Sequence, residues 1–272
     1  IMWLGEQITE RGIGNGMSLL IFAGIVVNFP TALLNTLDQM QTGQIGPLRI
    51  LFLVAMAVVV IGAIIFVERG HRRITVQYAK RVVGRRQYGG SSTHIPLKVN
   101  TGGVIPVIFA SSILSFFTMA APLFEVGSWP RRAIDQVAYG MPLYNLLYVL
   151  GIIFFAYFYT SIIFNPDDVE NMRKYGGFVP GIRPGKRTAE YIDTILARIT
   201  LVGAFYLAAV ALLPELLITG FRVAPIPFIG ERLDAILPSW FTQGMGVTFY
   251  FGGTSLLIVV GVAMDTVQQV ES

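Results

Sequence analysis

The sequence lacks cysteine and is short of charge, and each shortage excludes a class of protein. None of its 272 residues is Cys, which excludes a disulfide-stapled secreted scaffold. Only 13% of the residues are charged, whereas soluble domains carry about 25%. Hydrophobic residues make up 54%, which is too many for a disordered chain and argues against a soluble enzyme. The composition indicates a polytopic membrane protein.

The sequence also shows no leader at its beginning. It starts Ile1-Met2-Trp3-Leu4-Gly5, without the basic segment, apolar core and small-residue cleavage site of a signal peptide. The first long apolar run begins near Met17, after a polar, glycine-rich stretch. We therefore expect a fragment or a processed chain, and a natural start is the alternative.

Six apolar stretches are long enough, or nearly so, to cross a bilayer core of about 30 Å as helices of about 20 residues. They cover Ile13–Leu34, Pro47–Val67, Gly103–Ala121, Pro142–Phe164, Ile192–Leu213 and Val247–Met264. Runs of this length exclude barrel strands, which alternate over about ten residues. The predicted fold class is an all-α polytopic membrane protein with six transmembrane helices.

The basic residues predict the orientation of these helices. Residues 68–102 hold eight of the 20 Lys and Arg residues, and residues 165–198 hold six. The alternate loops hold two at most. The positive-inside rule therefore places both basic loops, and with six spans both termini, in the cytoplasm.

Each basic loop contains more local structure than a linker needs. In the first, Arg73–Ala79 alternates like a strand and Gly84 and Gly89 supply turns, which predicts a basic hairpin. In the second, Pro180-Gly181 and Pro184-Gly185 bracket Arg183, which predicts a stiff, cationic tip. Such a tip suits an anionic partner such as RNA phosphate or an acidic protein face. Alternatively, the charge only sets topology and contacts anionic lipid.

The sequence contains no convincing catalytic, metal or cofactor site. His71 and His94 lie in one loop without Cys or paired carboxylates at ligand spacing. The run Gly12–Gly16 lacks the preceding strand and the Lys-Ser/Thr of a nucleotide-binding loop, so close helix packing explains it better. Charge is nearly absent from the spans, which argues against an ion-coupled carrier.

The third stretch is the most polar of the six. It carries Ser and Thr residues that can hydrogen-bond to neighbours or water, and we expect Pro106 to weaken its first turns. Asn100 precedes it and could cap the helix. Two interpretations stay open: a packed helix with polar contacts, or a helix that moves at an interface.

Several runs of the sequence resemble the SecY family of protein-conducting channels, in its carboxy-terminal half. They are Gly5–Gly16, Phe66–Gly70, Pro96–Asn100, Gly103–Ser112, Phe178–Gly185 and Phe249–Val260, in the family's order and across nearly the whole chain. The resemblance implies a ten-span fold of two inverted halves. Residues 1–46 would hold the fifth span, and residues 47–272 the five spans of the second half.

The resemblance also implies roles for individual residues. An apolar pore ring matches Met17, Ile21, Ile108 and Ile258, with Met17 in place of an expected isoleucine. A gate-lining helix that parts from its partner when a signal sequence enters matches Asn100, Ser111, Ser112 and Phe116. A docking surface matches Arg72, Arg73, Lys80, Arg81, Arg85, Arg86, Arg183, Lys186 and Arg187, with Arg183 at its tip.

The function implied by the resemblance is a passive channel, not an enzyme, in the bacterial cytoplasmic membrane. Its expected partners are the SecE and SecG subunits, the motor ATPase SecA, the ribosome, signal sequences and nascent chains, lipids, and the amino-terminal half that carries the plug. Two other functions remain: a solute carrier, which would usually need charge within the membrane, and a structural anchor for a cytoplasmic complex.

Overall fold

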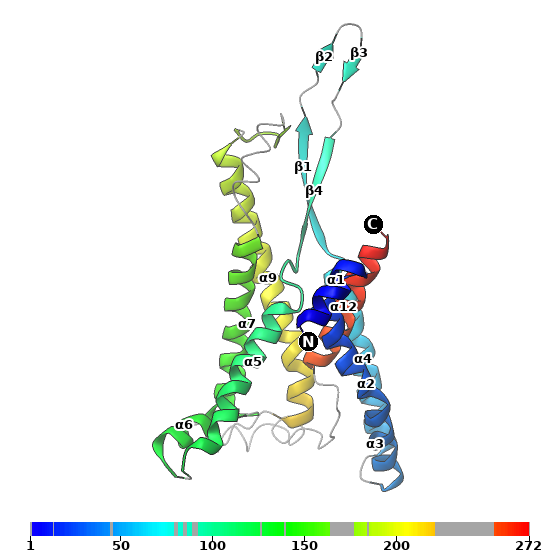
Figure 1. Ribbon diagram of the computed structural model, residues 1–272, viewed down its shortest axis with the longest axis vertical. Helices are drawn as coiled ribbons and strands as arrows, with labels where there is room; N and C mark the ends of the chain where they lie inside the picture. The colour runs from blue at the N-terminus through cyan, green and yellow to red at the C-terminus, as the bar shows by residue number, and fades with distance from the viewer. Residues whose placement is uncertain are drawn as a thin grey trace.

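The computed structural model describes residues 2–12, 14–43, 46–78, 81–83, 86–88, 92–125, 127–138, 140–163, 177–183, 185–220 and 253–271. These residues form a bundle of long helices from which a narrow β-hairpin projects at one end (Figure 1). Helix α3 (Phe29–Gln41) and helix α6 (Trp129–Gln136) reach the opposite end of the bundle (Figure 1). The C-terminus lies toward the end that carries the hairpin.

Five of the helical segments are long and apolar enough to span a membrane, counted within the described part of the chain. They are Gly16–Gln41, which combines α2 (Gly16–Val27) with α3; α4 (Pro47–Glu68); Ile105–Leu123, which combines α5 (Ile105–Ala120) with the short helix η1 (Ala121–Leu123); α7 (Pro142–Ile163); and Lys186–Pro214 within α9 (Lys186–Thr219). The prediction of a polytopic helical membrane fold is confirmed. The sixth stretch starts among residues outside the description and continues as α12 (Gly253–Glu271).

Three helices differ from what the sequence predicts, two in their bounds and one in the effect of a proline. The first span divides at Asn28, because Pro30 suits the first turn of α3, where no N–H is needed. For the same reason Pro106 does not weaken the third span, since it occupies the first turn of α5. The fifth helix, α9, has 34 residues, about 50 Å at 1.5 Å per residue, and therefore extends beyond a bilayer core.

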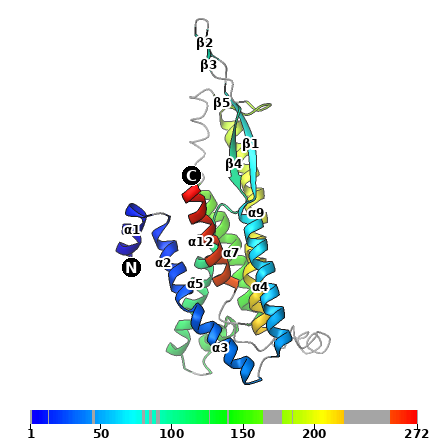
Figure 2. The same cartoon turned by 90° about the vertical axis from the view of Figure 1, so that its right-hand side faces the viewer.

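The predicted basic hairpin is present. Strands β1 (His71–Tyr78) and β4 (Ser92–Lys98) pair antiparallel, with His71 opposite Lys98. Strands β2 (Arg81–Val83) and β3 (Arg86–Tyr88) pair beyond them toward the tip, and β5 (Gly177–Phe178) joins β1 on its other side. Figure 2 shows the hairpin rising in line with α9.

A small hydrophobic cluster fastens the hairpin to the long helix. Ile74 and Val76 of β1 pack with Val179 and with Ile192 and Ile195 of α9. Val76 and Ile192 are each 1% exposed. The helix therefore begins before the predicted start of the span at Ile192, and the apolar residues there pack on the hairpin.

The helices pack as two groups that share one core. Contacts link α5 with α7 and α7 with α9, while α12 contacts α2, α4 and α9. A single cluster runs through both groups, with Ile64 of α4, Val107 of α5, Ile152 of α7 and Leu257 of α12 fully or almost fully buried. By contrast, α2 and α3 bury only Gly16 and Ala32 and leave most of their apolar side chains exposed.

Candidate functional site

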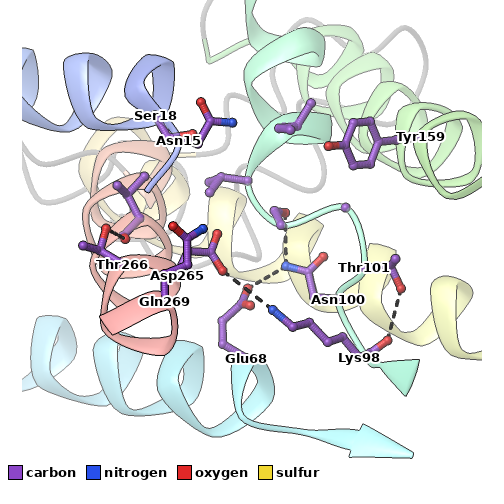
Figure 3. Close-up of a pocket in the computed structure, with 15 residues that line it drawn as sticks. Asn15, Ser18, Glu68, Lys98, Asn100, Thr101, Tyr159, Asp265, Thr266 and Gln269 are labelled. Atoms are coloured by element: carbon purple, nitrogen blue, oxygen red, sulfur yellow. Dashed lines mark hydrogen bonds and ion pairs between the residues drawn. The ribbon is translucent and has the colours of Figure 1, made fainter. Parts of the chain in front are cut away.

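A polar cavity of about 250 Å³ lies between the two helix groups (Figure 3). The loop between β4 and α5 forms one side of it, and the start of α2, the end of α4, α7 and α12 contribute the rest. The polar side chains that line it are Asn15, Ser18, Glu68, Lys98, Asn100, Thr101, Tyr159, Asp265, Thr266 and Gln269.

The strongest contact in this cavity joins Asn100 to the end of α4. The Asn100 Nδ2 atom donates to Glu68 Oε1 at 2.6 Å and to the Gly103 carbonyl at 3.1 Å. Asn100 is buried, at 6% exposure. The prediction that Asn100 caps the third span was wrong: Val104 holds the N-cap position of α5 without a side-chain hydrogen bond. The amide instead ties the approach to α5 to a carboxylate on another helix.

Lys98 connects the same rim of the cavity to α12. Its Nζ atom donates to Gln268 Oε1 at 2.9 Å and lies 3.9 Å from Asp265 Oδ1. Both charged side chains are about half exposed, so water screens this ion pair and it contributes little stability.

The loop after Lys98 is held closely on its other side by α9. A Cβ atom on Gly203 would lie 2.6 Å from the Val99 carbonyl oxygen. Only glycine allows this approach of helix to loop. Gly103 in the same loop has φ +56°, a conformation that favours glycine.

The glycine-rich run near the N-terminus serves helix packing, as its lack of a nucleotide-loop context indicated. Helix α1 (Met2–Arg11) packs on α2, and a Cβ atom on Gly16 would collide with the backbone of Gly5. Thr9 Oγ1 accepts a hydrogen bond from the Gly16 N–H at 2.9 Å, and Asn15 Oδ1 accepts one from the Met17 N–H at 3.1 Å. Asn15 is thus the N-cap of α2.

Three of the four predicted pore-ring residues each lie one helical turn from a cavity-lining residue of their own segment. Val104 and Val262 belong both to the cavity wall and to the core cluster. Ile108 is four residues from Val104, Ile258 is four from Val262, and Ile21 is three from the cavity-lining Ser18. Because residues three or four apart share a helix face, these isoleucines continue the cavity walls away from the hairpin.

The three isoleucines all contribute to the hydrophobic core that the two helix groups share. Ile258 is buried in the core cluster, and Ile21 and Ile108 pack against it. Met17 lies elsewhere, 41% exposed and over Gly5 of α1.

The predicted gate residues of α5 do not contact one another through polar groups. Ser111 and Ser112 both donate to the Ile108 carbonyl, at 3.0 and 2.7 Å. Their hydroxyls are therefore satisfied within their own helix, a common arrangement for serine in helices. Phe116 points outward, 70% exposed, with an edge contact to Phe117.

The predicted docking residues gather at the hairpin end of the molecule. Arg72 and Arg73 are exposed on β1, and Lys186 and Arg187 are exposed in the first turn of α9. Arg81 and Arg86 lie on strands β2 and β3, while Lys80 and Arg85 lie outside the described residues.

Arg183 is also exposed, in the turn before α9. Gly181, with φ +85°, and Gly185, with φ +119°, flank it, as the predicted pair of turns requires. The Arg183 carbonyl accepts a hydrogen bond from Thr188 Oγ1 at 3.0 Å, which fixes the backbone of the turn to α9.

The contacts of Glu68, and of Asp265 and Gln268 on α12, were not predicted from the sequence. A signal was available for Glu68, because the runs Phe66–Gly70 and Pro96–Asn100 flank the predicted hairpin and must meet at its base. Within the described parts of the chain, no group of three or more His, Cys, Asp or Glu residues is placed to hold a metal ion.

Comparisons with known proteins agree with this architecture. The SecY family model matches residues 1–267. Protein translocase subunit SecY of Escherichia coli strain K12 is 48% identical over 276 residues, covering 100% of this chain and 57% of that protein. The same subunit of Streptomyces galbus is 46% identical over 275 residues, covering 100% and 58%. The chain thus spans little more than half the length of these relatives.

Solved structures share the fold at low sequence identity. One, described as the structure of a protein conducting channel, superposes with a TM-score of 0.62 at 17% identity, covering 99% of this chain and 61% of that one. A second, from work on the plug domain of the SecY protein, gives 0.61 at 16% identity, covering 99% and 62%.

Proposed function

The chain belongs to the SecY family, and from this premise we propose that it forms the second part of the central pore subunit of a protein translocase. Secretory polypeptides pass through this pore across the bacterial cytoplasmic membrane, and transmembrane segments leave it sideways into lipid. The chain is a passive channel that performs no chemical step. SecA or the translating ribosome supplies the driving force, and ATP hydrolysis belongs to SecA.

One arrangement carries the proposal: apolar residues follow the polar cavity one helical turn deeper on three helices. The cavity is lined by amides, hydroxyls and charged groups, whereas Ile21, Ile108 and Ile258 follow one turn deeper from three different helices. A narrow apolar ring excludes water and therefore blocks ions, yet its side chains yield around a passing chain. Met17 would complete this ring in the whole protein.

The distribution of charge supports a docking end. The hairpin, the Arg183 turn and the start of α9 lie at one end of the bundle, and we assign this end to the cytoplasm by the positive-inside rule (Figure 1). Exposed arginines there suit ribosomal RNA phosphates and the acidic groups of SecA. Both termini of the chain then lie in the cytoplasm.

The exposed helix faces of this chain indicate where the remaining partners would bind. Most apolar side chains of α3 and several of α2 are exposed in this chain, as expected if the amino-terminal half of the subunit, with its plug, covers them. SecE, SecG and lipid contact the outer faces. Signal sequences enter beside Asn100, Ser111, Ser112 and Phe116 of the gate-lining helix and its preceding loop.

Replacing Ile258 by Asn in the full-length subunit tests the proposal. A polar side chain in the ring would hold water, so we expect ion conductance to rise about tenfold and preproteins with defective signal sequences to be accepted. Conductance across planar bilayers and translocation into proteoliposomes measure the two effects. A solute carrier would show neither change, and that result would reject the channel.

The control for this experiment is Ile162→Asn. Ile162 is 63% exposed near the end of α7 and outside the core cluster, so the same change of side chain should leave conductance and selectivity unchanged.

A further inference from the structure

We propose that Glu68 and Asn100 form a latch that holds the two helix groups together and sets the threshold for signal-sequence entry. The inference rests on the proposed channel function and adds to it a residue, Glu68, with a positioning role. Neither side chain needs to contact the passing polypeptide, because the latch acts through the position of α5.

The contact itself has the properties of a latch. The 2.6 Å separation between Asn100 Nδ2 and Glu68 Oε1 is short, as expected for a hydrogen bond to a carboxylate. Asn100 is buried, so opening the contact without a replacement partner leaves a buried amide unsatisfied. The second donation, to the Gly103 carbonyl, holds the amide in the orientation that meets Glu68.

The latch lies where the hairpin joins the membrane helices. Glu68 is the last residue of α4, and β1 begins three residues later at His71. Lys98 ends β4, and Asn100 follows two residues later. At this base the Val99 N–H donates to the Gly70 carbonyl at 3.0 Å. A force on the hairpin therefore reaches the Glu68–Asn100 contact before it reaches α5.

The latch also crosses between the two helix groups. Helix α5 packs mainly on α7, whereas α4 packs on α12. Glu68 belongs to the α4 side, and Asn100 leads within five residues to Ile105, the start of α5. Figure 3 shows the Glu68 and Asn100 side chains facing each other at the rim of the polar cavity between these groups.

Among the described side-chain contacts at this base, the Glu68–Asn100 pair is more buried than the contacts of Lys98. The Lys98–Asp265 pair beside it is half exposed and weak. Gly103, at φ +56°, would allow the loop to bend once the latch opens, because a Cβ atom there would meet no atom within 4 Å. Loss of the latch should therefore favour separation of α5 and α7 from α4 and α12.

An exchange of the two functional groups tests the latch in the full-length subunit, assembled with its partners. Asn100→Asp sets two carboxylates against each other, and Glu68→Gln removes the charge while keeping an acceptor of the same size. The double variant Glu68→Gln, Asn100→Asp restores an amide–carboxylate hydrogen bond with donor and acceptor exchanged. The readout is the translocation rate of a preprotein with a defective signal sequence, divided by that of the same preprotein with an intact signal.

We expect Asn100→Asp to raise this ratio about tenfold, because one lost charge-assisted hydrogen bond shifts an equilibrium by at least that factor. Glu68→Gln should raise it less. The double variant should lower it clearly below the Asn100→Asp value without reaching wild type, because the contact between positions 68 and 100 is re-formed while the carboxylate at position 100 cannot donate to the Gly103 carbonyl. Asn35→Asp, the same change at an exposed position of α3, is the matched control and should leave the ratio unchanged. Abundance and melting temperature of each variant show whether it has folded.

Each outcome decides a separate question. Unchanged ratios in both single variants, or a double variant as permissive as Asn100→Asp alone, would overturn the latch. If the single variants do not fold but the double variant does, the pairing is supported by the rescue. If the wild-type subunit fails to translocate even the intact preprotein, the proposed function fails, and the latch is not the cause.

Discussion

At the residue scale, the close contacts at the base of the hairpin depend on side-chain size as much as on charge. The Val99–Asn100 segment has Glu68 on one side and the backbone of α9 on the other. Gly203 sets how near α9 can come. The position of Asn100, and with it the short contact to Glu68, therefore depends on a residue that lies outside both resembling motifs at the base of the hairpin.

This dependence predicts the effect of Gly203→Ala. The new methyl group would lie 2.6 Å from the Val99 carbonyl oxygen, so helix or loop must shift. We expect a loss of about 1–3 kcal/mol in the free energy of unfolding, as for other overpacked sites. A lower melting temperature of the purified protein in detergent would report it.

The matched control is Gly62→Ala in α4, where a Cβ atom would meet no atom within 4 Å. This change should be neutral or slightly stabilising, because alanine is the better helix former. Equal melting temperatures for the two variants would contradict the close approach of α9 to the loop.

At the element scale, the hairpin is a fixed arm and not a free loop. Its first strand is buried on one face against the extension of α9, and β5 covers one edge of it. The long helix thus connects the basic end to the membrane core in one rigid piece.

Replacing Val76 by Asp should release this arm. Val76 is 1% exposed, and an aspartate there would be buried among Ile74, Val179 and Ile192 without a partner charge. We expect the hairpin to detach from α9 and to be cleaved by trypsin at least about tenfold faster, while the membrane spans stay protected. Limited proteolysis of the reconstituted protein measures the rate.

Gln77→Asp provides the comparison one residue further along β1. Its side chain is exposed, since successive residues of a strand face opposite sides. The Gln77→Asp variant should be cleaved by trypsin at the wild-type rate. If both variants were cleaved equally fast, charge alone, and not burial of a charge, would weaken the hairpin.

At the scale of the whole molecule, the net charge is only +4, but the basic residues are distributed unevenly along the chain. Fourteen of the 20 basic residues lie in residues 68–102 and 165–198, and Arg72, Arg73, Arg183, Lys186 and Arg187 are exposed at one end. The proposed docking is therefore largely electrostatic.

We expect Arg183→Glu in the full-length subunit to impair translocation while leaving membrane insertion and abundance intact. Reversing the charge at the tip of a fixed turn should repel the anionic groups of a partner. Binding of wild type to ribosomes or SecA should weaken as salt is raised, because exposed charges are screened over about 10 Å at 0.1 M. Co-sedimentation across a salt series and translocation assays measure both effects.

Arg132→Glu serves as the control, because Arg132 is equally exposed but lies on α6 at the opposite end of the bundle. Unchanged translocation by the Arg183→Glu variant would remove the docking role of the tip.

The sequence by itself determined the helical membrane class, three of the spans to within a few residues, the hairpin and the turn around Arg183. These features follow from local rules: apolar length, strand alternation, and proline and glycine chemistry. The pore-ring role of Ile21, Ile108 and Ile258 rests on the family resemblance and on no local rule, and it stays a prediction.

Only the tertiary structure decided what depends on elements distant in the sequence. The first turns of the 34-residue helix α9 pack on the hairpin, and the partner of Asn100 lies 32 residues away at the end of α4. The sequence alone does not distinguish an asparagine that caps a helix from one that bonds to a carboxylate distant in the chain. Only the fold determines which acceptor comes within reach, because the hairpin brings the ends of α4 and β4 to one point.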